Sequence, residues 1–179
     1  STFQLNLPIV PITDLAIKND NLIAATQGRS LWIIDDLTPL HQISDDVASS
    51  DFYLYKPMPS YKMDGGSSQP SRTSGQNHPG GVMVSYYIKE VTDSTKVRIE
   101  FKDNKGDLIR AFDTQPDDDK KEVKLKDIKS GGNRFVWDMR YPPASKFDGM
   151  ILWWASMQGP EALPGNYKVK MTVNGETME

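Results

Sequence analysis

Carboxylates that are adjacent in the sequence are the first residues whose chemistry could be catalytic. They occur as Asp35 with Asp36, as Asp45 with Asp46, and as the run 117–119. Cleavage of a glycosidic bond needs two carboxyl groups on opposite sides of the substrate, several ångströms apart. Sequence neighbours usually point in different directions, so these carboxylates do not predict that geometry. The first pair follows an expected strand and precedes an expected helix, so a role in the turn and at the start of the helix explains it. A solvated loop explains the run, whose spacing does not match that of a calcium-binding loop.

Cysteine and histidine chemistry has even less support. The chain has no cysteine, which excludes a disulfide framework, a thiolate metal site and a cysteine nucleophile. Its two histidines are His41 and His78, and neither has the neighbours of a catalytic triad or of a metal site. The sequence therefore predicts no catalytic residue, no metal site and no cofactor.

Aromatic residues give a sharper hypothesis. Tyr141, Trp153 and Trp154 lie within a short stretch of chain that follows Trp137. Sugars stack on exposed aromatic faces, so these three residues are the candidate carbohydrate-binding residues. The alternative is that Trp137 fills the core and one tryptophan of the pair packs beside it. Adjacent residues of a strand face opposite sides, so one of the pair could also be exposed or cover an interface.

Length and charge exclude several broad classes. The 179 residues include 21 Lys and Arg against 24 Asp and Glu, and the net charge of −3 argues against a general nucleic-acid-binding protein. Hydrophobic residues make up 37% of the chain, which is enough for a globular core in one or two domains. No apolar run approaches the roughly 20 residues of a membrane-spanning helix, so no membrane span is expected.

The elements that would position these residues are predicted to be strands. Apolar and charged residues alternate with period two, which is typical of strands with one buried face. The expected strands are 82–89, 97–102, 108–112, 123–125, 135–139 and 167–173, with polar turns at 92–95, 103–106 and 129–132. Phe135, Trp137 and Met139 share a face and form the heaviest core block. Residues 82–179 therefore predict an all-β fold, an immunoglobulin-like β-sandwich of about 100 residues.

The remainder divides into two parts. Residues 1–50 predict a short β-meander with strands at 12–17, 22–26 and 31–34, then one short helix near 38–49 with Thr38 as N-cap and Pro39 at the first position. Residues 51–81 predict an extended segment at 52–55 and a linker rich in Gly, Ser and Pro. The meander is too small for a core of its own. We expect it to pack on the sandwich or to pair with another copy through its strand edges.

Several longer segments resemble a known family. Segments 3–8, 10–15 and 20–40 resemble the last blade of a sortilin-type β-propeller, as found in bacterial glycosyl-hydrolase-like proteins with BNR (Asp-box) repeats. Segments 53–57, 76–81, 133–141, 147–153 and 159–167 resemble the immunoglobulin-like domain that follows such a propeller. The Asp-box pattern Ser-x-Asp-x-Gly-x-x-Trp is absent, so no catalytic residue of the family can be carried onto this chain.

The resemblance implies a role for the chain as part of a larger protein. It implies a non-catalytic C-terminal structural or interaction module, comprising a blade remnant at 1–50 and the sandwich at 82–179. The hairpin signal at Asn174 and Gly175, four residues before the last, also predicts that the natural chain continues. The implied partners are the upstream propeller domains and a polysaccharide or protein, and the implied location is the periplasm or the cell surface. Two alternatives stay open: a carbohydrate-binding module using Tyr141, Trp153 and Trp154, and a contribution to a hydrolase active site in the full-length protein.

Overall fold

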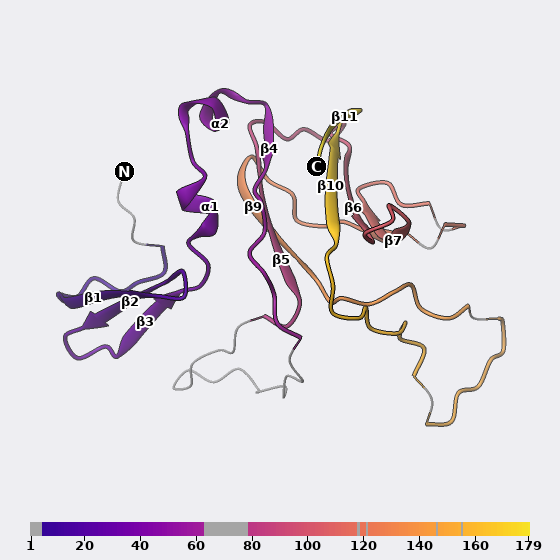
Figure 1. Ribbon diagram of the computed structural model, residues 1–179, viewed down its shortest axis with the longest axis horizontal. Coiled ribbons are helices and arrows are strands. Elements are labelled where there is room, and N and C mark those ends of the chain that lie inside the picture. Colours follow the sequence, from indigo (N-terminus) through magenta and orange to yellow (C-terminus); the bar gives the residue numbers. More distant parts are fainter. Residues whose placement is uncertain (1–4, 63–78, 118, 121, 146, 155) are drawn as a thin grey trace.

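The computed structural model describes residues 5–62, 79–117, 119–120, 122–145, 147–154 and 156–179. Within these residues the fold is all-β, with strands in several sheets and two short helices (Figure 1). His78 and most of the predicted linker, residues 63–78, lie outside the described residues. Neither helix of the described chain has the length and apolar character needed to cross a bilayer.

The first sheet is an antiparallel meander with the order β1-β2-β3. Its strands are β1 (Ile12–Lys18), β2 (Asn21–Thr26) and β3 (Leu31–Ile34), close to the predicted ranges. Asn19 and Asp20 connect β1 to β2 with φ of +51° and +57°. Asparagine and aspartate tolerate this left-handed conformation, which gives a two-residue turn the twist that a hairpin needs. The polar dipeptide therefore fixes the register of the meander.

Two short helices follow, where the sequence predicts one helix near 38–49. They are α1 (Thr38–His41) and α2 (Asp45–Ser49), and Ser44 separates them in an extended conformation. The Ser44 hydroxyl accepts a hydrogen bond from the Val47 N–H, so Ser44 begins a new helix instead of continuing the first. Thr38 as N-cap is also wrong: Leu37 occupies that position, and the Asp36 carboxylate accepts from the Thr38 N–H at 3.0 Å.

The other strands form two further sheets. One is three-stranded, with the order β4-β5-β9, and consists of β4 (Phe52–Leu54), β5 (Val82–Ile88) and β9 (Gly131–Trp137). The other is five-stranded, with the order β11-β10-β6-β7-β8, and consists of β6 (Val97–Lys102), β7 (Leu108–Asp113), β8 (Val123–Lys124), β10 (Lys168–Val173) and β11 (Glu176–Met178). All pairings are antiparallel except β7 with β8. The Asn174-Gly175 hairpin is confirmed, because β10 and β11 pair across it.

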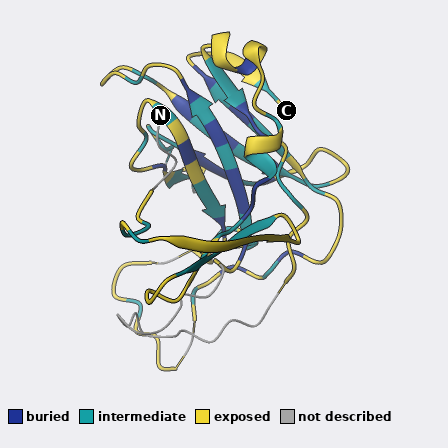
Figure 2. Ribbon diagram, turned by 90° about the vertical axis from the view of Figure 1, so that its left-hand side faces the viewer, coloured by how far each residue is buried: buried dark blue, intermediate teal, exposed yellow. Residues whose placement is uncertain are grey.

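These two sheets share one core. Phe101 of β6 is fully buried and stacks on Trp137 of β9, with ring centroids 4.4 Å apart. Phe112 of β7 lies 4.5 Å from Phe135 of β9. Figure 2 shows the buried residues as stripes along the strands, as period-two alternation requires. The core position of Trp137 is confirmed, whereas Phe135 and Met139 are only partly buried.

The first sheet lies at one end of the molecule, beyond α1 (Figure 1). Every residue of β1 is exposed, and apolar side chains of both outer strands are more than half exposed. They are Leu15 (60%), Ile17 (67%), Leu31 (65%) and Ile33 (56%). The expectation that the meander buries its apolar side chains against the rest of the chain is therefore wrong for the described residues. Its alternative, pairing with another copy, stays a prediction.

Candidate functional site

The candidate carbohydrate-binding residues lie in the long connection from β9 to β10. We call residues 138–166 the aromatic loop; it extends away from the two-sheet core (Figure 1). Trp153 is 84% exposed, Trp154 is 97% exposed and Tyr141 is 37% exposed. The expectation that one tryptophan of the pair packs in the core is wrong. The pair lies in a bend, not in a strand, and Trp154 has a left-handed φ of +62°.

The loop tip is more apolar than the sequence analysis foresaw. Phe147 and Ile151 are 70% and 87% exposed. The spacing of residues 147–154 gave no signal of this exposure, since it lacks the period-two alternation from which a buried strand face is predicted. The structure does not join the three candidates into one aromatic platform, because no ring contact links Tyr141, Trp153 and Trp154. It places Tyr141 at the base of the loop and the tryptophans near its tip.

Paired backbone segments form the base of the loop, which we call the neck (residues 139–144 and 157–162). The Tyr141 N–H donates to the Pro160 carbonyl at 2.9 Å, and the Ala162 N–H donates to the Met139 carbonyl at 2.6 Å. Gly159, in the second segment, can lie this close to the first segment only because it lacks a side chain. A Cβ at Gly159 would lie 2.0 Å from the Tyr141 carbonyl oxygen.

An ion cluster closes the neck. Arg140 Nη2 lies 2.5 Å from Glu161 Oε1, and Lys62 Nζ lies 2.6 Å from Glu161 Oε2. Arg140 Nη1 also donates to the Gly159 carbonyl at 3.0 Å. The hydrogen bond and charge of Lys62, with a smaller contribution from Arg140, lower the pKa of Glu161. A general acid needs a raised pKa, so Glu161 does not fit that role. Its ion pairs with Lys62 and Arg140 hold the neck together.

The neck is in turn attached to the core. The Trp137 indole N–H donates to the Arg140 carbonyl at 3.2 Å, and the Arg110 guanidinium donates to the same carbonyl at 3.3 Å. Arg110 also pairs with Asp138 Oδ1 at 3.3 Å. A buried tryptophan and a half-buried arginine of β7 therefore position the start of the aromatic loop.

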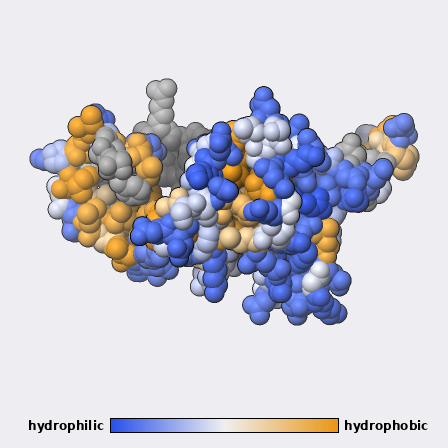
Figure 3. All heavy atoms as spheres, turned by 90° about the horizontal axis from the view of Figure 1, so that it is seen from above, coloured by the Kyte–Doolittle hydropathy of each residue, from blue (hydrophilic) through white to orange (hydrophobic). Residues whose placement is uncertain are grey.

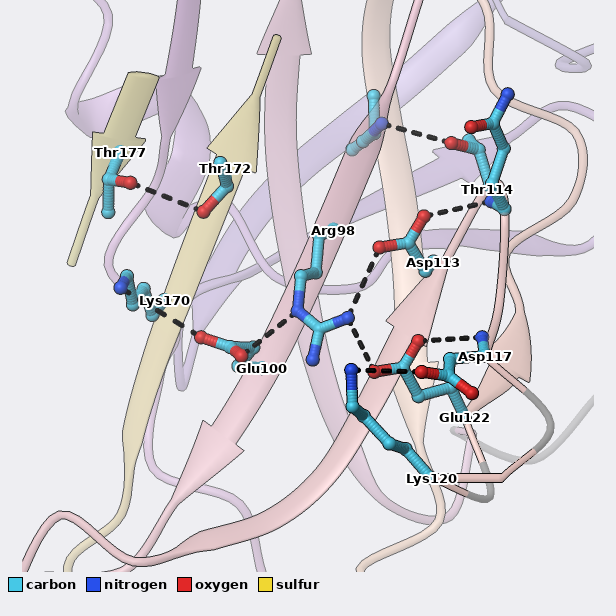
Figure 4. A network of polar contacts seen from close by, with 12 residues as sticks. Arg98, Glu100, Asp113, Thr114, Asp117, Lys120, Glu122, Lys170, Thr172 and Thr177 are labelled. Carbon is cyan, nitrogen blue, oxygen red and sulfur yellow. Dashed lines mark hydrogen bonds and ion pairs between the residues drawn. The ribbon is translucent and has the colours of Figure 1, made fainter. Parts of the chain in front are cut away.

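A second charged cluster lies on the five-stranded sheet (Figure 4). Arg98 lies 2.6 Å from Glu122, 3.0 Å from Glu100 and 3.3 Å from Asp113. Burial alone lowers the pKa of Arg98, but the hydrogen bonds and charges of these three carboxylates outweigh burial and raise it. Each carboxylate is paired with the arginine, so the cluster ties β6 to β7 and to the segment before β8. It does not provide an unpaired general acid or base.

In the carboxylate run, Asp119 is exposed and Asp117 is half-buried. Asp117 and Lys120 form an ion pair at 2.9 Å, which lowers the pKa of Asp117 and raises that of Lys120. Asp118 is outside the described residues. Across the part of the chain that the structure describes, no group of three or more His, Asp or Glu side chains could hold a metal ion.

The comparisons with known proteins add no relatives. No family model, no curated protein and no solved structure matches this chain.

Proposed function

We propose that the chain is a non-catalytic structural and interaction module of a larger protein, and that the two sheets that share the core form an immunoglobulin-like sandwich. The observation that carries the proposal is the three-stranded sheet β1-β2-β3, which exposes large apolar side chains on both faces. In this proposal further polypeptide covers both faces, as neighbouring layers do in a multi-sheet protein.

The strand register defines the two faces. Leu15 lies opposite Ala24 and Ile17 opposite Leu22, while Ile23 lies opposite Ile33. One face carries Leu15, Ile17, Leu22, Ala24, Trp32 and Ile34, and the other carries Ala16, Ile23, Ala25, Leu31 and Ile33 together with Asp14, Lys18 and Asn21. A solvated face of an antiparallel sheet is mainly polar, so apolar side chains on both faces favour a sheet that is covered on both faces.

The surface agrees with this composition. Figure 3 shows hydrophobic residues gathered over the end of the molecule that carries this sheet. Contiguous exposed apolar surface is typical of an interaction site. The resemblance to a propeller blade names the partner that we propose, the propeller domains of the same protein, and it also supports export to the periplasm or cell surface.

Sedimentation of the chain tests this proposal. Without its covering layers, the chain is expected to self-associate as its concentration rises, because apolar sheet faces exclude water by pairing. Replacing one exposed residue on each face, Leu15→Lys with Ile33→Lys, should leave a monomer. The matched control is Ile151→Lys, which removes an apolar residue of the aromatic loop that is even more exposed, at 87%, and should not alter the association.

Two results would contradict the proposal. One is a wild-type chain that stays monomeric, binds no hydrophobic dye and is unaffected by the double substitution. The other is hydrolysis of a polysaccharide by the purified chain, which would contradict the non-catalytic role.

A second candidate function is carbohydrate binding, which the near-complete exposure of Trp153 and Trp154 favours. Retention on immobilised polysaccharides should then fall when Trp153 or Trp154 is replaced by alanine. The retention should not change with the control Tyr61→Ala, because Tyr61 is an exposed aromatic residue (81%) outside the aromatic loop. Equal retention of all variants would exclude the tryptophans as the sugar-binding residues.

A further inference from the structure

The outer edge of β9, together with a groove beside it, points to a binding site for another polypeptide. We propose that an extended, acidic segment of a partner protein adds to this edge as an extra β-strand. The inference goes beyond the proposed function, because it concerns a different sheet and a different surface.

β9 is unusual among the sheet edges of the described chain. It pairs with β5 from Gly131 to Trp137 without a register shift, and Arg134 is its one charged residue. The edge strands β3, β4, β8 and β11 have only four, three, two and three residues. β1 is as long as β9, but its register shifts between Ile12 and Asp14, and it carries Asp14 and Lys18. Short, irregular or charged edges resist strand addition, so β9 is the edge best suited to accept a strand.

A groove of about 760 Å³ lies beside α1 and includes four successive residues of β9, 132–135, in its lining. Tyr55 and the β5 residues Ser85 and Tyr86 also line it, so the groove extends from β9 over the three-stranded sheet. An extended peptide paired with the outer edge of β9 could therefore also contact this groove.

The lining of the groove has an apolar wall and charged residues. The apolar wall consists of Pro39 and Leu40 of α1 with Ile43, and Leu40 and Ile43 are 42% and 57% exposed. The charged residues include Lys126 and Lys129, in the segment that precedes β9. The occupant should therefore combine apolar residues, which contact α1, with acidic residues, which contact the lysines.

The charges around the groove favour an acidic partner over a second copy of this chain. Lys126, Lys129 and Arg134 form no ion pair with the described residues. Asp36 and Asp127 also line the groove. Asp36 is buried and its carboxylate accepts a hydrogen bond from the Thr38 N–H, whereas Asp127 is exposed, so the three cations outnumber the exposed carboxylate of the groove. Antiparallel pairing of two β9 edges would bring the arginine and lysines of both copies together. Like charges opposite each other destabilise a strand pair, whereas carboxylates would be stabilised there.

A peptide probe tests the proposal on the whole chain. The probe is a fluorescent, extended peptide of alternating glutamate and valine, and binding is measured by fluorescence anisotropy. We expect saturable binding, weakened about tenfold or more by Arg134→Glu and by Lys129→Glu, which corresponds to about 1.4 kcal/mol. The matched control is Lys105→Glu, an exposed lysine of the turn before β7 that lies outside the groove, and it should leave binding unchanged.

Two further probes separate strand addition from simple charge attraction. A peptide with lysine in place of glutamate, and a glutamate peptide N-methylated at alternate residues, should each bind about tenfold more weakly or worse. Bound peptide should also slow amide exchange in β9. Ile43→Asp, on the apolar wall, gives a second variant if a charge reversal on β9 prevents folding.

Several outcomes would overturn the proposal. These are no binding of the glutamate peptide, equal binding of the N-methylated peptide, or loss of affinity in the Lys105→Glu control as large as in Arg134→Glu. Protection of β9 in a dimer of the chain, without peptide, would assign this edge to a second copy instead. The sedimentation test of Leu15 and Ile33 is independent of each of these results.

Discussion

Tyr86 shows how one buried group links the core to pH. It is 3% exposed on the core face of β5, and burial raises its pKa to about 12 from 10.0. The folded state favours the neutral phenol, whereas the unfolded chain ionises near the ordinary pKa of 10. The corresponding contribution to the free energy of unfolding is therefore complete below pH 10 and is lost as pH rises from 10 toward 12.

We therefore predict that Tyr86→Phe reduces the alkaline loss of stability. At about pH 11 the difference from the wild type should be roughly 1 kcal/mol, since one pKa unit corresponds to about 1.4 kcal/mol. Chemical unfolding near pH 8 and pH 11 measures the change. Tyr61→Phe, at an exposed position, should retain the wild-type pH dependence, and an equal loss of stability in Tyr86→Phe and the wild type would contradict the prediction.

Residue positions were predictable where a strand pattern continued and failed where it stopped. Trp137 was placed in the core because Phe135 and Trp137 share a strand face. The same reasoning extended the strand to Met139, but Met139 has a left-handed φ of +56° and β9 ends at Trp137. Beyond that point period two carries no information, so burial of Trp153 and Trp154 could not be judged from spacing alone.

Gly159 sets the geometry of a whole element, the neck of the aromatic loop. A Cβ at this position would lie 2.0 Å from the Tyr141 carbonyl oxygen and 2.5 Å from that of Pro142. We predict that Gly159→Ala separates the two neck segments, because backbone atoms cannot yield as a flexible side chain does.

Amide exchange measures this effect directly. In Gly159→Ala the Tyr141 and Ala162 amides, which donate across the neck, should exchange about tenfold faster or more, while β6 and β10 change little. Gly165→Ala is the matched control, because its Cβ would approach no atom closer than 3.9 Å. Unchanged exchange in Gly159→Ala would show that the neck does not depend on this close approach.

Element prediction succeeded for alternating strands and failed where glycine or a cap decided the boundary. Residues 129–132 predict a turn, yet Gly131 and Gly132 belong to β9 and lie opposite Ile88 and Tyr87. Pairing with β5 overrides the weak strand preference of glycine. The lysines before this strand and the arginine within it form no sequence motif, so the sequence could not predict the groove, which depends on how α1 lies relative to β9.

The molecule combines one well-buried core with a largely exposed sheet, β1-β2-β3. Val97, Ile99 and Phe101 of β6 are at most 1% exposed, whereas β1 is exposed throughout. An all-β chain of several sheets was predictable from period two. The difference in burial between the sheets was not predictable. The apolar residues of the meander follow the same sequence pattern whether they are buried or exposed.

This difference predicts two levels of stability within one chain. Amides of β6 should exchange only when the core unfolds, whereas amides of β1 to β3 should exchange about a hundredfold faster or more through local opening. Hydrogen exchange measured residue by residue tests this, with β10 as the internal reference because it pairs with β6 in the same core. Polypeptide that covers the meander should slow exchange in β1 to β3 and leave β6 unchanged. A single exchange rate shared by all three sheets would instead mean that the meander unfolds cooperatively with the core, and would remove the energetic reason for a covering partner.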